Sequence, residues 1–345
     1  MNDKRIAYLD CLRIVSILAV IVLHVSAAWW RGCAPGSGAW QIANVINGAT
    51  RWAVPVFVMI SGALFLSRDI PVKTLYSKYA LRLAIAYVVW AVIYTLPRVA
   101  LGKTEGVQIL LDLLRGSGHL WFLPMLIGLY LCQPILRQIT RSKAVTRYFL
   151  VLSFVVSFAI PFLLRIVTDF FGVVPGRFAE EMRSVLSNAA LQTVSGFSFY
   201  YVLGYYLHKC ELTARRRRAV YALGIVGFAL TIGLTVLIQR KTGEAVERYF
   251  DPLSMNAALM AAAVFTWART HVQQSGKAAQ GLAKYAFGAY LCHMLFLAAP
   301  PYLGIDLAAL SPLVWIPLVS LGVAAVSFAV SFVLNRIPVL NRWIV

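Results

Sequence analysis

The residues that could carry chemistry stand out because the chain around them is apolar. The run from Tyr8 to Trp30 is long enough to cross a bilayer, yet it contains Asp10, Arg13 and His24. Placing a charged side chain well inside a spanning helix costs about 2.5–3.5 kcal/mol on insertion scales, so such residues usually face a bundle interior and mark a pathway or a site. A cation and a titratable imidazole in one span therefore predict an active site within the membrane.

The spacing of these residues places them on one edge of the helix. At 100° per residue, the eleven steps from Arg13 to His24 leave the two about 20° apart around the axis and about 16 Å apart along it. Asp10 and Arg13 are i, i+3 neighbours, so we expect them to pair. His24 then lies past the membrane midplane, where an imidazole suits general-base chemistry near neutral pH. The predicted edge consists of Asp10, Arg13, Ile17, Val20, Ile21 and His24.

The composition points to an integral membrane protein. Of the 345 residues, 60% are hydrophobic and 13% are charged, against about 25% charged in a soluble domain. A net charge of +19 would suggest nucleic-acid binding in a soluble protein, but here the distribution of charge across a membrane explains it better, so no nucleic acid is expected. The cysteines are odd in number and scattered, which indicates neither a disulfide framework nor a metal site. They are Cys11, Cys33, Cys132, Cys210 and Cys292.

Apolar runs of membrane-spanning length recur ten times. The chain is therefore predicted to be an all-α membrane protein, a bundle of about ten transmembrane helices that forms a single domain over residues 1–345. The longest link, 169–191, is too short for a soluble domain, and its charges suggest a small amphipathic cap. The predicted spans are 9–30, 43–66, 79–98, 119–136, 148–168, 192–207, 219–239, 253–270, 285–304 and 312–334.

The charged links predict the orientation of the bundle. If both termini are cytoplasmic, that side holds 21 of the 32 Lys and Arg residues and 4 of the 13 Asp and Glu residues. The opposite side holds 11 and 9, so the net charges are +17 and +2. The positive-inside rule then predicts an N-in, C-in chain. A cleavable signal peptide, with Lys4 and Arg5 ahead of the apolar run, is the weaker interpretation because Arg13 opens that run.

Basic residues also occur in two further predicted spans. Lys78 and Arg82 stand at the cytoplasmic start of the third span, and as i, i+4 neighbours both could hold one anion. They fit equally well as positive-inside anchors or as a clamp for phosphates arriving from the cytoplasm. Arg51 precedes an apolar run that Pro55 breaks, and we regard it as a supporting site residue.

Histidines mark two other spans. His119 stands with Trp121 where the fourth span begins, and it fits an interfacial hydrogen bond more readily than a catalytic role. His293 lies within the ninth span, where a structural hydrogen bond would be sufficient reason for a buried imidazole. His208 and His271 fall in basic links, and we expect both to be solvated.

Four motifs in order resemble the acyltransferase-3 family, the membrane-bound acyltransferases that decorate surface glycans with acetyl groups. They are the pair Arg13 and His24 separated by ten residues, AVPVFVMISG at 53–62, HLWFL at 119–123 and AYLCH at 289–293. The resemblance extends over essentially the whole chain. The stretch IANVINGATRWAVPVFVMISGALF looks most like the branch that contains the enterobacterial common antigen O-acetyltransferase.

The resemblance implies roles for specific residues. Arg13 and His24 match the family's signature pair, with His24 as the expected catalytic residue. A basic pair at the start of the third span is expected to hold the nucleotide end of acetyl-coenzyme A. In much of the family this pair is Arg-x-x-Arg. The nearest match in this chain is Lys78 with Arg82, in which the two residues are one position farther apart. The acceptor would be a hydroxyl of a surface glycan or lipid-linked oligosaccharide, and the chain would lie in a bacterial inner membrane among its lipids, without a metal.

The expected mechanism is acyl transfer across the membrane. His24 would remove the proton of an acceptor hydroxyl as it attacks the thioester, and a second donor would stabilise the oxyanion. His119, Tyr290 and His293 could supply that donor.

The alternative from another class is a secondary transporter or exporter of a small acylated or amino-acid-like solute, which shares polar residues inside the bundle and proline-broken spans. The sequence shows neither repeated halves nor a chain of intramembrane carboxylates for ion coupling. If the chain were a structural or sensory membrane protein, the placement of Arg13 and His24 on one helix edge would have no functional explanation.

Overall fold

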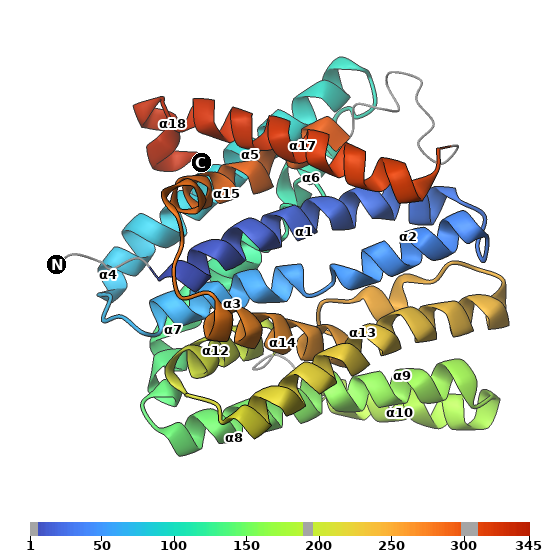
Figure 1. Cartoon of the computed structure of the whole chain (residues 1–345). Helices are drawn as coiled ribbons and strands as arrows, with labels where there is room; N and C mark the ends of the chain where they lie inside the picture. The colour runs from blue at the N-terminus through green and yellow to red at the C-terminus, as the bar shows by residue number, and fades with distance from the viewer. Residues whose placement is uncertain (1–5, 189–195, 298–309) are drawn as a thin grey trace.

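The computed structural model describes residues 6–188, 196–297 and 310–345, and within these ranges its regular structure is entirely helical. Figure 1 shows the helices laid together as one bundle. The described helices are α1 (Ala7–Gly32), α2 (Gly38–Ala49), α3 (Ala53–Phe65), α4 (Val72–Thr74), η1 (Leu75–Ala80), α5 (Leu81–Ala100), α6 (Val107–Arg115), α7 (Phe122–Thr140), α8 (Lys143–Phe154), η2 (Val155–Ala159), α9 (Ile160–Phe170), α10 (Val173–Asn188), α12 (Gly196–Lys209), α13 (Ala214–Thr242), η3 (Glu247–Phe250), α14 (Met255–His271), α15 (Lys277–Leu297), α17 (Pro312–Leu334) and α18 (Pro338–Trp343).

Seven helical segments of the described chain are long and apolar enough to cross a membrane. This confirms an all-α protein with multiple membrane-spanning helices, whereas the count of ten and the orientation stay predictions. Two of the other predicted spans correspond to shorter helices, α12 with 14 residues and α14 with 17. Residues 192–195 and 298–304 of the predicted spans lie outside the described residues. The seven segments are Ala7–Gly32, Gly38–Phe65, Val72–Ala100, Phe122–Thr140, Lys143–Phe170, Ala214–Thr242 and Pro312–Leu334.

The predicted span 43–66 is broken in its middle. α2 ends at Ala49 and α3 begins at Ala53, with Pro55 in the first turn of α3. Proline has no N–H and its ring clashes with the carbonyl four residues earlier, so it is best tolerated in the first turn of a helix. The break leaves Arg51 in the turn between the two helices.

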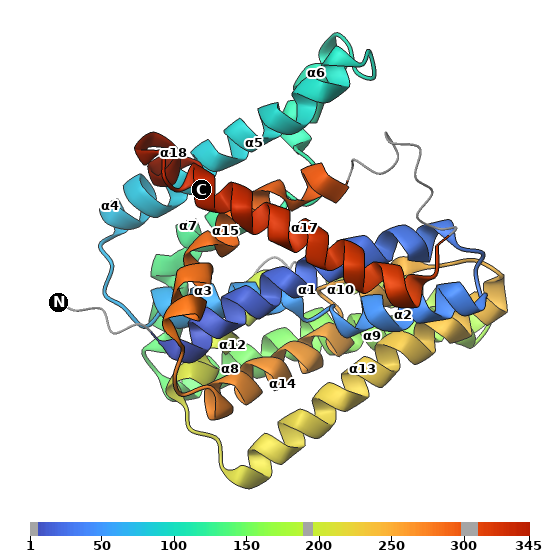
Figure 2. The same ribbon diagram turned by 45° about the horizontal axis from the view of Figure 1, so that its top comes forward.

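α1 lies in the middle of the bundle and contacts α2, α3, α14, α15 and α17. Its N-terminal end lies at the same end of the bundle as α18 (Figures 1 and 2). The hydroxyl of Tyr8 lies 2.5 Å from Nδ1 of His208, which brings the end of α12 to this same place. His208 is thus half-buried and hydrogen-bonded, and the expectation that it is solvated was wrong; His271 is exposed as expected.

α3 and α12 cross with their backbones in contact. A Cβ added to Gly62 would lie 1.8 Å from the carbonyl oxygen of Tyr201, and one added to Gly204 would lie 2.0 Å from that of Met59. Only glycine permits such an approach. The glycine of the AVPVFVMISG motif therefore serves helix packing, and it fixes α3 as one wall of the site described next.

The link 169–191 is helical over most of its length. α10 covers residues 173–188 and packs against α9, while residues 189–191 lie outside the described residues.

Candidate active site

The polar edge of α1 forms as its spacing predicts. Nη1 of Arg13 donates to Oδ1 of Asp10 at 2.8 Å, and Asp10 is buried. A buried carboxylate is costly unless it is paired, and this bond supplies the partner of Asp10 and holds the Arg13 guanidinium against α1. Arg13 is therefore held in place by a residue of its own helix.

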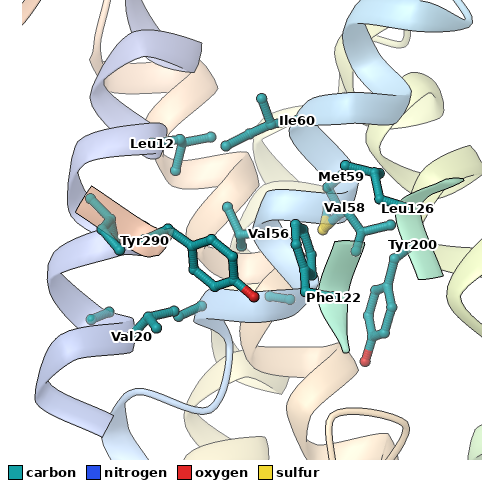
Figure 3. Packing of buried hydrophobic residues seen from close by; sticks show 14 of the residues in the cluster. Leu12, Val20, Val56, Val58, Met59, Ile60, Phe122, Leu126, Tyr200 and Tyr290 are labelled. Carbon is teal, nitrogen blue, oxygen red and sulfur yellow. The ribbon is translucent and has the colours of Figure 1, made fainter. Parts of the chain in front are cut away.

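A cavity of about 340 Å³ opens beside this edge, bounded by α1, α3, α5, α7 and α15. Arg13 and Val20 line it from α1, so it follows the helix for seven residues toward His24. Tyr290 and Phe122 line it as well, with their ring centroids 5.6 Å apart. Figure 3 shows the Tyr290 ring between α1 and α3, with Phe122 beyond it. The volume lies in the range of small-molecule sites, about 300–1,000 Å³.

Three cations from three different helices line this cavity. They are Arg13 on α1, Arg82 on α5 and Lys284 on α15. Arg82 also donates to the main-chain oxygens of Asn341, at 3.4 Å, and of Val345. Three positive charges around one cavity are suited to a ligand that carries several phosphate oxygens.

Lys78 is not among the residues that line the cavity, although the sequence pairs it with Arg82. It is exposed, and its Nζ lies 5.6 Å from the centroid of the Tyr79 ring. Residues 75–80 form a π-helical turn, η1, so the α-helical i, i+4 geometry does not apply there. Lys284, which the sequence did not single out, lines the cavity with Arg82 instead.

Three histidines from three separate segments meet beyond the Tyr290 end of the cavity. The ring centroids of His24 and His293 are 5.3 Å apart, and those of His119 and His293 are 5.1 Å apart. His119 and His293 are almost fully buried, whereas His24 is partly exposed. The three sequence motifs around these histidines therefore describe one place in the fold. The described residues contain no group of His, Cys, Asp and Glu arranged to hold a metal ion.

Main-chain carbonyls fix the tautomers of two of these rings. Nδ1 of His293 lies 2.6 Å from the carbonyl oxygen of Tyr290, and Nε2 of His119 lies 3.3 Å from that of Leu291. A carbonyl oxygen only accepts, so in the neutral rings these two nitrogens carry the protons. Nε2 of His293 and Nδ1 of His119 are then lone-pair acceptors, and both are buried without a partner.

These hydrogen bonds bear on the predicted oxyanion donors. The hydroxyl of Tyr290 donates to the carbonyl oxygen of His119, so its proton is occupied too. In their neutral forms His119, Tyr290 and His293 thus direct every proton at the main chain. The two histidines therefore offer the site acceptor nitrogens, which can orient the N–H or O–H group of a neighbour.

The two remaining predicted residues lie elsewhere. Trp121 is 37% exposed and packs on Phe122 and Phe197, outside the lining of the cavity. Arg51 is not among the residues that line the cavity, and it donates to the carbonyl oxygen of Phe250 at 3.1 Å.

Lys284 is the functional residue that sequence reasoning missed. It stands six residues before Tyr290 on α15, and both side chains line the cavity. A helical reading of the AYLCH motif toward its N-terminus reaches Lys284 within two turns, which is the signal that could have found it.

The comparisons with known proteins agree with this arrangement. The family model described as an acyltransferase domain, acyltransferase-3, matches residues 6–335. A search of the curated proteins found no match, and a search of the solved structures found none. The matched range includes the polar edge of α1, all three cavity cations and all three histidines. The chain therefore belongs to the acyltransferase-3 family of membrane acyltransferases.

Proposed function

We propose that this protein transfers an acetyl group from cytoplasmic acetyl-coenzyme A to a hydroxyl of a glycan on the opposite face of a bacterial inner membrane. The observation that carries the proposal is a single cavity with three cations along it and three histidines beyond one end. In the predicted N-in, C-in orientation the cations would face the cytoplasm. The resemblance to the enterobacterial common antigen branch is the basis for an acetyl donor and for a surface or lipid-linked glycan as acceptor.

The donor would enter among the cations. Phosphate oxygens of coenzyme A would pair with Arg13, Arg82 and Lys284, each interaction a charge-assisted hydrogen bond. The pantetheine arm would follow the α1 edge past Val20, and the rise of about 16 Å between Arg13 and His24 suits its reach. The thioester would then lie beside His24, with Tyr290 and Phe122 as apolar walls.

His24 would act as the general base. It takes the proton from the acceptor hydroxyl while the hydroxyl oxygen attacks the thioester carbonyl. The C–S bond breaks as the ester forms, and the departing thiolate takes the proton back from the imidazolium, so both partners leave neutral. Nε2 of His293 is the available acceptor for an N–H of His24, which would orient the base as a carboxylate does in a triad.

Replacing His24 tests the proposal. We expect His24→Ala and His24→Asn to lower acetylation of surface glycan by about 10²–10⁴-fold at matched protein levels in the membrane, because a positioned general base contributes that much. Mass spectrometry of the surface polysaccharide measures the transfer. Full acetylation in both variants would exclude His24 as the base, and uptake of a solute into proteoliposomes without acetyl-coenzyme A would favour a transporter.

A further inference from the structure

A polar stripe on α2 lies beside the stretch of α1 from Leu23 to Trp30, whereas the cavity lies beside Arg13 and Val20. It consists of Trp40, Asn44, Asn47 and, just past the helix end, Arg51, spaced at 4, 3 and 4 residues so that they share one face. Asn47 positions the stripe against α1, because its Nδ2 lies 2.9 Å from the carbonyl oxygen of Leu23 and 2.9 Å from Oγ of Ser26. The stripe therefore begins beside the catalytic turn of α1.

Three hydrogen-bond donors of this stripe are buried and have no partner. They are Nε1 of Trp40, Nδ2 of Asn44 and Nε of Arg51, and Trp40 and Asn44 are 0% exposed. The amide of Asn44 cannot be turned to remove its donor, because its Oδ1 accepts from Nε1 of Trp30 at 3.1 Å. Native proteins rarely leave buried donors unpartnered, and each such group calls for an explanation.

The guanidinium of Arg51 is fixed in place by its other contacts. Nη1 donates to the carbonyl oxygen of Phe250, Nη2 donates to Oδ1 of Asn47, and Cζ lies 4.0 Å from the centroid of the Phe250 ring. No carboxylate pairs with Arg51 in the described part of the chain, and the nearby Glu247 is taken up by Arg31 at 2.7 Å. A guanidinium without an ion pair is thus presented together with two neutral N–H donors.

Aromatic rings enclose these donors. The ring centroids of Trp30 and Trp40 are 5.8 Å apart, and those of Trp30 and Phe250 are 5.4 Å apart. Flat rings with adjacent N–H donors are the lining that mostly apolar ligand sites use to fix a polar group. Phe250 covers the guanidinium, so a ligand that reaches Arg51 displaces this ring.

We propose that the α2 stripe is the acceptor subsite and that it binds an anionic oxygen group of the glycan, a uronic acid carboxylate or a sugar phosphate. The inference rests on the proposed function, which places the acceptor on this side of His24. The three free groups only donate, and one is charged, so they match a group that only accepts. A neutral sugar hydroxyl would leave the Arg51 guanidinium without an ion-pair partner.

The test uses purified full-length protein with acetyl-coenzyme A and three p-nitrophenyl glycosides: a glucuronide, a glucoside 6-phosphate and the neutral glucoside. Mass spectrometry measures the acetylated products. We expect the charged glycosides to exceed the neutral one at least tenfold in kcat/KM, and the better of the two identifies carboxylate or phosphate. Equal use of all three, or transfer to the neutral glucoside alone, would overturn the proposal.

Two variants with opposite chemistry sharpen the test. Arg51→Gln should remove most of the preference for charged glycosides, and Asn44→Asp should reverse it, because aspartate keeps an acceptor for Trp30 but replaces the donor with a negative charge. Trp40→Phe keeps the ring and should give a smaller loss. Gln41→Leu, on the same helix but off the stripe, should change nothing. If Arg51→Gln and Asn44→Asp affect charged and neutral glycosides alike, the donors bind only water.

One further measurement separates this inference from the proposed function. Hydrolysis of acetyl-coenzyme A by water needs no glycan and should depend on His24. Unchanged rates of both transfer and hydrolysis in the His24→Asn variant would contradict the proposed function. Reactions that depend on His24 while the stripe variants leave glycoside preference intact would contradict only the acceptor subsite.

Discussion

Two buried histidines of the site have their protons assigned by the main chain. His119 and His293 each donate to a carbonyl oxygen of α15, which leaves one bare nitrogen on each ring. Such a nitrogen can hold the N–H of a neighbouring base in one orientation, and the ring centroid of His24 lies 5.3 Å from that of His293. In the proposed mechanism, the imidazole of His293 would take the place of the carboxylate that orients the base in a triad.

A substitution at His293 tests this positioning role. His293→Leu removes the acceptor and should lower kcat by about 10–10²-fold, whereas His293→Gln keeps a side-chain oxygen that can accept and should retain more activity. The KM for acetyl-coenzyme A should not change, and the pH profile of kcat should shift in the Leu variant because His24 loses its partner. An unchanged profile together with a loss in both variants would mean that His293 only fills space.

The cavity cations give a second prediction at this scale. Arg82→Gln and Lys284→Gln should each raise the KM for acetyl-coenzyme A by about tenfold or more, since a hydrogen bond to a charged group contributes about 1.5–3 kcal/mol. Lys78→Gln removes the same charge from an exposed position outside the cavity and serves as the matched control. A larger effect at Lys78 than at Lys284 would restore the sequence-based clamp.

At the scale of the elements, breaks in helices decide where functional groups lie. Pro55 ends α2 early and leaves Arg51 in the turn, where its side chain can reach Phe250. The π-helical turn η1 rotates Lys78 out of register with Arg82. The close glycine contact between α3 and α12 fixes the position of α3, which forms one wall of the cavity.

The contact between α3 and α12 should be intolerant of a single methyl group. Gly204→Ala would place a Cβ 2.0 Å from the carbonyl oxygen of Met59, so one backbone must move, and we expect a loss of about 1–3 kcal/mol of unfolding free energy. Gly233→Ala on α13 meets nothing within 4 Å and should be neutral or stabilise the helix by about 1 kcal/mol. Thermal unfolding in detergent compares the two. Equal stability of both variants would contradict the tight crossing.

At the scale of the whole molecule, charge asymmetry predicts orientation. The links assigned to the cytoplasm carry a net charge of +17 and the opposite links +2. Because the positive-inside rule acts through short loops, this difference favours one orientation strongly. The start of α1 and α18 lie at one end of the bundle, which an even number of crossings requires (Figure 2).

Cysteine labelling of intact cells tests the orientation. Residue 105 falls in a link assigned to the outside and residue 142 in one assigned to the cytoplasm, and both are exposed. A membrane-impermeant maleimide should label Glu105→Cys in intact cells and Ser142→Cys only after permeabilisation, against the background of the parent chain's own cysteines. Labelling of Ser142→Cys in intact cells would reverse the orientation.

The sequence by itself determined the features that depend on one helix or on composition. Apolar length predicted a helical membrane protein, and the 100° period predicted the edge shared by Asp10, Arg13 and His24, because both follow from the geometry of a single element. Motif order was enough to indicate the family, which the match over residues 6–335 confirms.

Only the tertiary structure decided which side chains from different helices meet. The rotation of α5 and α15 about their axes is set by packing and by the π-helical turn, so Lys284 rather than Lys78 lines the cavity with Arg82. The tautomer of His119 depends on a carbonyl group of another helix, that of Leu291 on α15. This contact joins residues 172 positions apart, and no local periodicity encodes it.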